Sequence, residues 1–262
     1  MESKLYYPHH AHLAPGSIGD SILRIPEYVA KAKEYGLTHL TMTDHGSLSA
    51  MYAFCDECIK HGIEPIVGME AYECEDNSLK DKEHRGYNHL VLLAKNKIGL
   101  KNLFSIHNNA TTDGFYYKPR TDFTDLKKYG KGIIGMSACV AGAIPQAILD
   151  DDPEKAIEII LKYKECFDEF YLELQPGDFE EQQKVNEALI ELADYTNTPL
   201  VVTNDIHYLN AEDYSVHDYH VKLGRPKDNK VISDELIYPD TCYWFMDWKT
   251  VNASVQRSSF VT

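Results

Sequence analysis

Three short clusters of histidine and aspartate follow apolar runs in this chain, and together they could bind several metal ions. Imidazole and carboxylate groups suit zinc, manganese or iron, and a carboxylate can bridge two ions. The clusters come from distant parts of the sequence, as a multinuclear metal site requires. They are His10-Ala11-His12, Thr43-Asp44-His45 and Asn204-Asp205-Ile206-His207.

The spacing within the clusters favours shared ligation. His10 and His12 are two residues apart, so on a strand both side chains project from the same face. Asp205 and His207 repeat this spacing. Asp44 could bind a metal ion directly or orient a neighbouring histidine through a hydrogen bond.

Strand-like and helix-like patterns alternate along the chain, which is typical of an α/β protein with a parallel sheet. Ligands from the first, second and last strands would meet most easily at one rim of a closed barrel. We therefore predict a seven-stranded (β/α)7 distorted TIM-like barrel. The predicted strands lie near residues 4–7, 38–43, 64–72, 89–94, 132–137, 169–174 and 199–203. The predicted helices include residues 26–35, 49–61, 153–166 and 180–195.

Composition narrows the class of protein. The 262 residues are 44% hydrophobic and carry a net charge of −15, which is unfavourable for nonspecific binding to a polyanion. We expect a cytoplasmic protein, because the six cysteines are too dilute for a disulfide scaffold and MESKLYYPHH is not a signal peptide. No apolar stretch is long enough to span a bilayer, so no membrane partner is expected. The CxxC formed by Cys55 and Cys58 has no second pair and is not expected to bind metal.

A basic pair stands out in this acidic chain. Lys118 and Arg120 lie beside Tyr116 and Tyr117, and they could bind phosphate while a tyrosine stacks on a base. The alternative is a solvated loop with packed aromatic side chains. Residues 75–88 are polar and are predicted to form an exposed loop, whereas residues 224–262 show no clear periodicity.

Several longer motifs give the sequence a recognisable pattern. It resembles the PHP (polymerase and histidinol phosphatase) domain of bacterial replicative DNA polymerase III alpha subunits, from about residue 5 to about residue 248. The resemblance implies the PHP fold, a seven-stranded barrel that binds up to three metal ions. We therefore expect a PHP phosphoesterase barrel over residues 1–248. Residues 249–262 would form a tail that is either disordered or the start of a polymerase region. The matching motifs are TDHGSL (43–48), IEPIVGMEAYE (63–73), NHLVLLAKNKIGLKNL (88–103), DGFYYKPRTDF (113–123), GIIGMSACVAGAIP (132–145), FYLELQ (170–175) and TNDIHYL (203–209).

The resemblance also implies a set of nine metal ligands, all of which are present here. Two of them depart from the family pattern or from our strand prediction. Asp20 follows a loop that is one residue longer than usual, and His89 opens a predicted strand instead of closing one. The implied ligands are His10, His12, Asp20, His45, Glu70, His89, Cys139, Asp205 and His207. Our candidates for the catalytic residues among them are His12, Glu70, Asp205 and His207.

The expected function is metal-dependent hydrolysis of a phosphoester, with two to three divalent ions of zinc, manganese or iron. By resemblance, the substrate would be the 3′ end of DNA and the activity a 3′–5′ proofreading exonuclease, with the polymerase core or other replisome subunits as partners. One alternative is a stand-alone phosphatase that acts on a small phosphomonoester. A second alternative is a catalytically silent module that braces a replicative polymerase, which the intact ligand set argues against.

Overall fold

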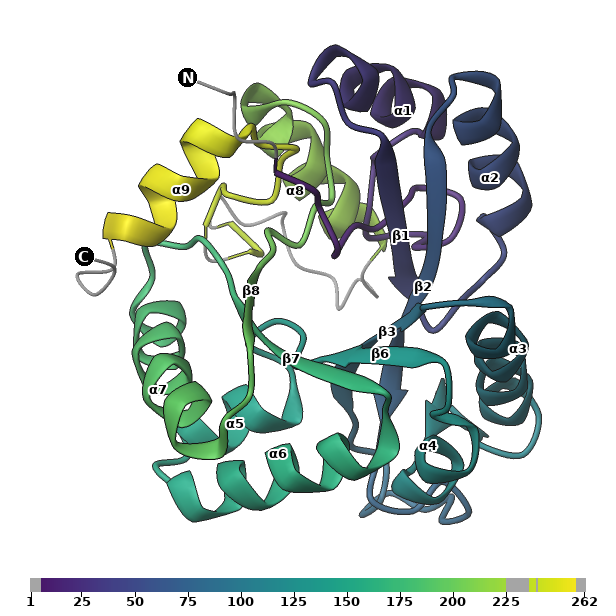
Figure 1. Ribbon diagram of the computed structural model, residues 1–262, viewed down its shortest axis with the longest axis vertical. Helices are drawn as coiled ribbons and strands as arrows, with labels where there is room; N and C mark the ends of the chain where they lie inside the picture. The colour runs from purple at the N-terminus through teal and green to yellow at the C-terminus, as the bar shows by residue number, and fades with distance from the viewer. Residues whose placement is uncertain (1–5, 225–235, 239, 258–262) are drawn as a thin grey trace.

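The protein is a curled mixed β-sheet with helices packed around its outer face, as the computed structural model shows (Figure 1). The structure describes residues 6–224, 236–238 and 240–257. Along the sheet the strands follow the order β4-β5-β2-β3-β6-β7-β8, and β1 pairs in parallel with residues 64–70 of β2. The strands are β1 (His39–His45), β2 (Glu64–Glu73), β3 (Asn88–Ala94), β4 (Phe115–Tyr116), β5 (Lys118–Thr121), β6 (Ile133–Met136), β7 (Glu169–Leu174) and β8 (Leu200–Val202).

Residues 10–13 connect the two ends of the curled sheet. The backbone N–H of Thr43 in β1 donates to the carbonyl of Ala11 at 2.7 Å. On the other side, the N–H of His12 donates to the carbonyl of Ile206, beyond β8, at 2.8 Å. The predicted strands thus follow one another around the sheet. The first of them is displaced, because the segment that pairs at this position is residues 10–13 and not residues 4–7. Residues 4 and 5 lie outside the described part of the chain, and residues 6 and 7 are not in a strand.

One strand runs against the expected direction. We predicted a parallel sheet, but β3 is antiparallel to both of its neighbours, β2 and β6. The reason is the connection: residues 75–87 between β2 and β3 form a loop and not a crossover helix, and a parallel neighbour would need such a crossover. As a consequence, the start of β3 lies at the same rim as the ends of β1 and β2. The predicted exposure of residues 75–88 is confirmed for most of this loop.

The predicted helices are confirmed within two residues at each end. Several begin with a side chain that caps the first turn, as Asp152 does by accepting from the N–H of Lys155 at 2.9 Å. The helices are α1 (Ile25–Glu34), α2 (Met51–Lys60), α3 (Lys97–Thr111), α4 (Phe123–Tyr129), α5 (Ala143–Leu149), α6 (Pro153–Cys166), α7 (Glu180–Thr196), the 3₁₀ turn η1 (Ala211–Asp213), α8 (Tyr214–Gly224) and α9 (Trp248–Arg257).

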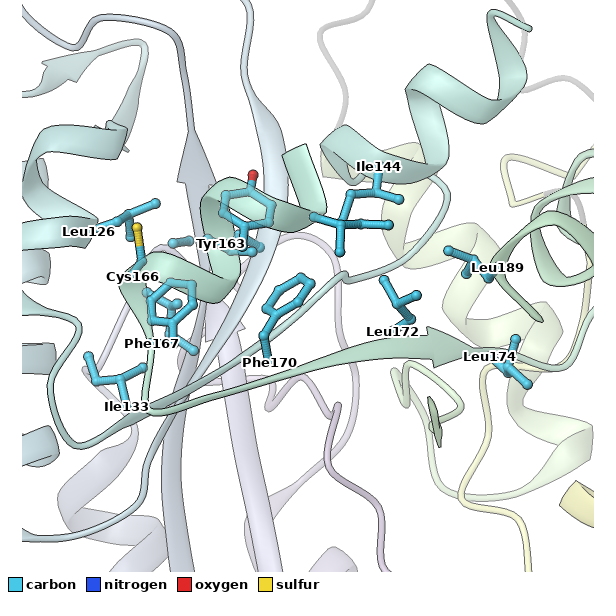
Figure 2. Packing of buried hydrophobic residues seen from close by; sticks show 14 of the residues in the cluster. Leu126, Ile133, Ile144, Tyr163, Cys166, Phe167, Phe170, Leu172, Leu174 and Leu189 are labelled. Carbon is cyan, nitrogen blue, oxygen red and sulfur yellow. The ribbon is translucent and has the colours of Figure 1, made fainter. Parts of the chain in front are cut away.

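The largest apolar cluster lies between the sheet and helices α5, α6 and α7. Phe170 and Leu172 of β7 pack there with Tyr163 of α6 and Leu189 of α7 (Figure 2). This layer fixes β7 and the strand ends beside it, where the predicted ligands lie. No helix within the described residues is long and apolar enough to cross a membrane.

Residues 249–257 of the predicted tail are ordered, which contradicts the first of its two alternatives, whereas the start of a polymerase region stays a prediction. Residues 249–257 belong to α9, whose side chains Val251 and Val255 are buried in the same apolar cluster. The two valines are four residues apart and therefore share one face of the helix. Residues 258–262 lie outside the described part of the chain.

Candidate metal centre

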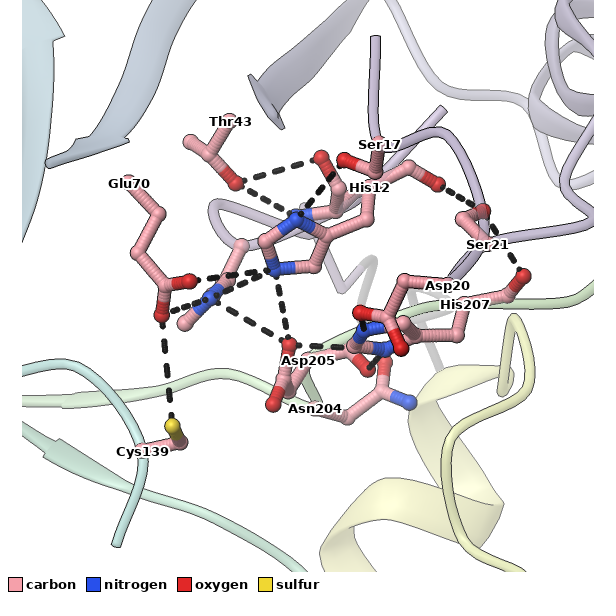
Figure 3. A network of polar contacts seen from close by, with 12 residues as sticks. His12, Ser17, Asp20, Ser21, Thr43, Glu70, Cys139, Asn204, Asp205 and His207 are labelled. Carbon is pink, nitrogen blue, oxygen red and sulfur yellow. Dashed lines mark hydrogen bonds and ion pairs between the residues drawn. The ribbon is translucent and has the colours of Figure 1, made fainter. Parts of the chain in front are cut away.

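All nine predicted metal ligands lie together at one rim of the curled sheet. This rim contains residues 10–13, the end of β1, the segment that follows β8 and the start of β3. Glu70 reaches it from within β2, and Cys139 from the loop after β6. The antiparallel direction of β3 explains why His89 enters from a strand start. Figure 3 shows several of these side chains pointing toward one another from separate segments.

The most buried part of the centre is formed by His10, His12 and Asp205. Nε2 of His10 lies 3.1 Å from Nε2 of His12. Oδ1 of Asp205 lies 3.3 Å from the first of these nitrogens and 3.0 Å from the second. Ligand atoms that each lie about 2.1 Å from one tetrahedral ion are about 3.4 Å apart. The spacing therefore fits three ligands of a single ion.

Glu70 occupies the middle of the centre and is fully buried. Its Oε1 lies 3.2 Å from Nε2 of His10. Its Oε2 lies 2.6 Å from Nδ1 of His45 and 3.1 Å from Nδ1 of His89. Sγ of Cys139 lies 3.6 Å from Nδ1 of His89. The two oxygens of Glu70 thus face different sets of ligands, as in a carboxylate that bridges two ions.

Asp20, the least regular of the predicted ligands, lies on the outer side of the centre. Its Oδ2 is 2.6 Å from Nε2 of His45 and 3.2 Å from Nε2 of His207. The rings of His45 and His207 both stack on the ring of His12, with centroids 4.0 and 4.5 Å away. This places a third group of potential ligands beside the first two.

Several buried polar atoms of the centre lack hydrogen bonds to the described residues, which supports a metal site and not a network of hydrogen-bonded side chains. Oε2 of Glu70, Nδ1 of His45 and Oδ1 of Asp205 are buried, and none of them has a hydrogen-bond partner within the described structure. Each nevertheless lies close to other ligand atoms, in directions that do not suit hydrogen bonds. Buried polar atoms left without hydrogen bonds are costly, so the arrangement fits atoms that converge on bound cations.

The charges and pKa values of the side chains in the centre also favour bound cations. Burial lowers the pKa of His12 to about 3, so this imidazole is neutral and its lone pair is free. For His45, burial lowers the pKa, but Glu70 and Asp20 outweigh it and raise the value to about 10. Burial and the charges of Glu70 and Asp205 raise the pKa of the Cys139 thiol, which a metal ion would have to reverse.

A second layer of side chains holds the histidines in place, and sequence reasoning missed most of it. Oε2 of Glu173 lies 3.0 Å from Nδ1 of His10. Nδ1 of His12 lies 3.3 Å from Oγ of Ser17, and Ser17 donates to Oδ1 of Asp44 at 2.9 Å. Asp44 therefore contacts the centre only through Ser17, and within the described structure no hydrogen bond joins its side chain directly to a histidine. Glu173 belongs to the FYLELQ motif and alternates with buried residues on β7. This alternation was the sequence signal that could have identified Glu173.

Tyr238 was also missed, because it follows a stretch without periodicity. Its hydroxyl donates to Oδ1 of Asp20 at 2.7 Å and lies 3.4 Å from Nε2 of His207. Tyr238 lines a cavity of about 240 Å³ beside Cys139, Asp205 and His207. The metal centre therefore adjoins a pocket whose lining comes from several segments between His45 and Tyr243.

The basic loop is only partly as predicted. Lys118 lies at the edge of the centre, within a groove that also touches Asp20 and His45. Arg120, in contrast, is fully buried, and the prediction that it binds phosphate is wrong for this structure. Its guanidinium donates hydrogen bonds to backbone carbonyls, including those of His84 at 2.6 Å and Leu79 at 2.8 Å. The ring of Tyr116 lies 5.3 Å from the Arg120 guanidinium carbon and does not line the groove.

Residues 8–177 match the family model of the PHP domain. The DNA polymerase III subunit alpha of Borreliella burgdorferi is 41% identical over 219 residues, which cover 82% of this chain and 19% of that protein. The subunit from Aquifex aeolicus is 41% identical over 232 residues, covering 83% of this chain and 20% of that protein. The chain thus spans about one fifth of the length of these curated relatives.

Two solved structures match this chain at low sequence identity. An amidohydrolase from Chromobacterium violaceum has a TM-score of 0.49 and 14% identity, and the match covers 97% of this chain and 98% of that one. A proposed metal-dependent phosphoesterase from Bifidobacterium adolescentis has a TM-score of 0.44 and 13% identity, with coverage of 79% and 89%. By the match over residues 8–177, this chain belongs to the PHP domain family.

Proposed function

We propose that this protein is a metal-dependent phosphoester hydrolase. The observation that carries the proposal is that seven of the nine side chains form three neighbouring groups of potential ligand atoms, with the two oxygens of buried Glu70 facing different sets of ligands. Three groups of potential ligand atoms lie close enough to hold an ion: His10, His12 and Asp205; His45, Glu70 and His89; and His12, His45 and His207. Two to three divalent ions of zinc, manganese or iron suit this mixture of donors.

The bound ions would activate water at neutral pH and neutralise charge on the phosphoryl oxygens. The residues of the chain would position the reactants. Our candidates for the catalytic residues are His12, Glu70, Asp205 and His207. Tyr238 carries a hydroxyl between Asp20 and His207 that would donate its one proton to a substrate oxygen in the pocket only by releasing Asp20.

We infer that the natural substrate is the 3′ end of DNA, which the protein would shorten in the 3′–5′ direction as a proofreading exonuclease. The support is the similarity to DNA polymerase III alpha subunits, whose other regions would be the partners together with other replisome subunits. The protein would then work in the cytoplasm. A pocket of about 240 Å³ beside the centre suits the terminus of a strand better than its middle.

The test is a time course on single-stranded and duplex DNA labelled at the 5′ end, with manganese, zinc or iron supplied in turn. We expect products that shorten stepwise from the 3′ end, faster on frayed or mismatched termini. The Asp205→Asn variant is the control for a contaminating nuclease. Rapid release of phosphate from small monoesters, with no shortening of DNA under any metal, would contradict the DNA assignment.

That outcome would favour the phosphomonoester alternative, which the net charge of −15 supports because an acidic protein holds a long polyanion poorly. A protein that binds little metal and hydrolyses neither class of substrate would instead have a structural role.

A further inference from the structure

A groove of about 580 Å³ adjoins the metal centre. The predicted ligands Asp20, His45 and His89 form part of its lining. Lys118 of β5, Tyr87 of the loop before β3 and the glycine-rich turn of residues 16–19 belong to the same lining. The groove is therefore continuous with the centre and larger than the space that one phosphate would fill.

Lys118 is placed to receive an anion. Its Nζ lies 3.3 Å from the hydroxyl of Tyr72 and 4.9 Å from the centroid of that ring. Within the described residues it forms no ion pair, although the chain has 41 acidic and 26 basic residues. A half-buried ammonium group without a carboxylate partner is expected to attract a negatively charged ligand.

Tyr72 links Lys118 to the metal centre. This buried ring lies 6.2 Å from the ring of His45 and 5.5 Å from that of His89. The Lys118 ammonium group contacts the same ring and its hydroxyl, and in the described part of the chain none of the nine predicted ligands forms a hydrogen bond or ion pair with it. An anion at Lys118 can therefore be a neighbour of the group that the ligand set would bind.

Tyr87 supplies an aromatic surface in the lining of the groove. Its side chain is 39% exposed, and its ring packs edge-to-face on Tyr72 at 4.7 Å. Its ring is also nearly parallel to that of His89, at 6.2 Å. Ile18, which is 85% exposed, belongs to the same lining. A flat apolar group such as a base could stack on the exposed part of Tyr87.

We propose that this groove binds the nucleotide adjacent to the scissile phosphate of a nucleic-acid strand, with Lys118 on the neighbouring phosphate and Tyr87 stacked on a base. The inference rests on the proposed phosphoester hydrolysis at the metal centre and narrows its substrate class to a chain of at least two phosphates. A small phosphomonoester would place its only phosphate at the ions and leave Lys118 and Tyr87 unused.

The first test compares two substrates of one enzyme preparation. One is a single-stranded oligonucleotide, and the other is p-nitrophenyl phosphate, which has one phosphate and no base. We expect Lys118→Ala to lower the ratio of kcat/KM for the oligonucleotide over the small ester about tenfold, the size of one charge-assisted phosphate contact. Lys155→Ala, which removes an equal charge from the exposed face of α6, should leave the ratio unchanged.

Tyr87 is tested with the base itself. Tyr87→Ala should lower the affinity for the oligonucleotide about tenfold, because stacking of one base contributes roughly 1–3 kcal/mol. Tyr87→Phe keeps the ring and should restore most of the loss. Substrates with single abasic positions near the 3′ end should include one on which Tyr87→Ala has little further effect. Tyr195→Ala, at an exposed tyrosine of α7, is the matched control.

Binding gives a readout that does not depend on turnover. The affinity for a fluorescent oligothymidylate is measured by anisotropy in EDTA at several salt concentrations. For Lys118→Ala we expect a plot of log Kd against log salt that is shallower by about 0.7, the value for one lost phosphate contact on a single strand. An unchanged slope, or equal losses on both substrates, would overturn the proposal. A wild-type protein that hydrolyses neither substrate with any metal, yet binds the oligonucleotide through Lys118, would contradict only the proposed hydrolysis.

Discussion

Nδ1 of His10 lies 3.0 Å from Oε2 of Glu173, and both side chains are buried. Glu173 also accepts hydrogen bonds from the backbone N–H of Ala138 at 2.7 Å and from the hydroxyl of Thr203 at 2.6 Å. A glutamate held in this way is an acceptor for the proton on Nδ1 of His10. Nε2 of His10 is then left unprotonated and faces the metal centre, as a metal ligand requires.

Replacing Glu173 with Gln should weaken metal binding about tenfold to hundredfold, the usual effect of losing such an outer partner. The amide can donate to Nδ1 and so favour the tautomer of His10 in which Nε2 carries the proton. Metal affinity is measured by competition with a chelator, and metal content by mass spectrometry. Glu169→Gln is the control on the same strand, because Glu169 pairs with Lys95 at the surface. Equal affinities of both variants and the wild type would contradict this role for Glu173.

Replacing Asp205 with Asn should abolish hydrolysis and leave the fold intact. Asp205 has a φ of 47°, in the left-handed region, where asparagine is among the best tolerated residues. The backbone should therefore persist while a charged ligand is lost, and we expect kcat/KM to fall at least about 100-fold. Activity, metal content and thermal unfolding are measured together.

Asp205→Ala separates the two effects of that position. It removes the same ligand but adds left-handed strain of roughly 1–2 kcal/mol, so it should be less stable than the Asn variant. A metal-loaded, folded Asn variant with wild-type activity would exclude Asp205 from the catalytic residues.

Part of the metal centre could be predicted from local patterns alone. The pairs His10 and His12, and Asp205 and His207, follow the two-residue period of a strand, and the structure brings both pairs to one rim. Glu70, His89 and Cys139 could be chosen only from the family resemblance. For His89 the reason is physical: β3 runs antiparallel, so the ligand lies at a strand start, and no local signal gives the direction of a strand.

Arg120 shows what the sequence could not predict. A basic residue beside Lys118 in an acidic chain suggests phosphate binding, but its environment depends on a loop some 40 residues earlier in the sequence. The carbonyls of Leu79 and His84 in that loop accept from its guanidinium. Tyr238 was missed for a related reason, since its contact with Asp20 spans most of the chain.

Replacing Arg120 with Ala should destabilise the protein by about 3 kcal/mol or more, because several buried carbonyls lose charge-assisted hydrogen bonds. Lysine at this position should recover less than half of the loss, since an ammonium group lacks the planar fork of the guanidinium. The free energy of unfolding is measured in urea. The carbonyl partners are those of Asn77, Leu79, His84 and Gly114.

Lys118→Ala is the comparison for this prediction, and its stability should change by less than about 0.5 kcal/mol. The two neighbouring basic residues would then separate into a structural one and a ligand-binding one. An Arg120→Ala protein of unchanged stability that loses only oligonucleotide binding would show instead that Arg120 contacts the substrate.

Glu73, at the end of β2, should make stability depend on pH. Burial raises the pKa of this carboxyl to about 7, although hydrogen bonds with Asn88 and Tyr163 act in the opposite direction. The folded state therefore holds the proton more tightly than the unfolded state, in which the pKa is near 4.3. The stability that Glu73 contributes is fully present at acidic pH and is lost as the pH rises through about 7.

Glu73→Gln imitates the protonated carboxyl and isolates this effect from the titration of the histidines, which both proteins share. At pH 8 we expect the variant to be more stable than the wild type by about 2 kcal/mol, since each unit of pKa shift corresponds to about 1.4 kcal/mol and part of the shift is screened by solvent. At pH 4 the two should agree within about 0.5 kcal/mol, because the wild-type carboxyl is then protonated in the folded state and mostly protonated in the unfolded state. Urea unfolding at intervals between pH 4 and pH 8.5 gives the comparison. A difference that stays constant across this range would mean that Glu73 is ionised throughout, and that the hydrogen bonds with Asn88 and Tyr163 outweigh its burial.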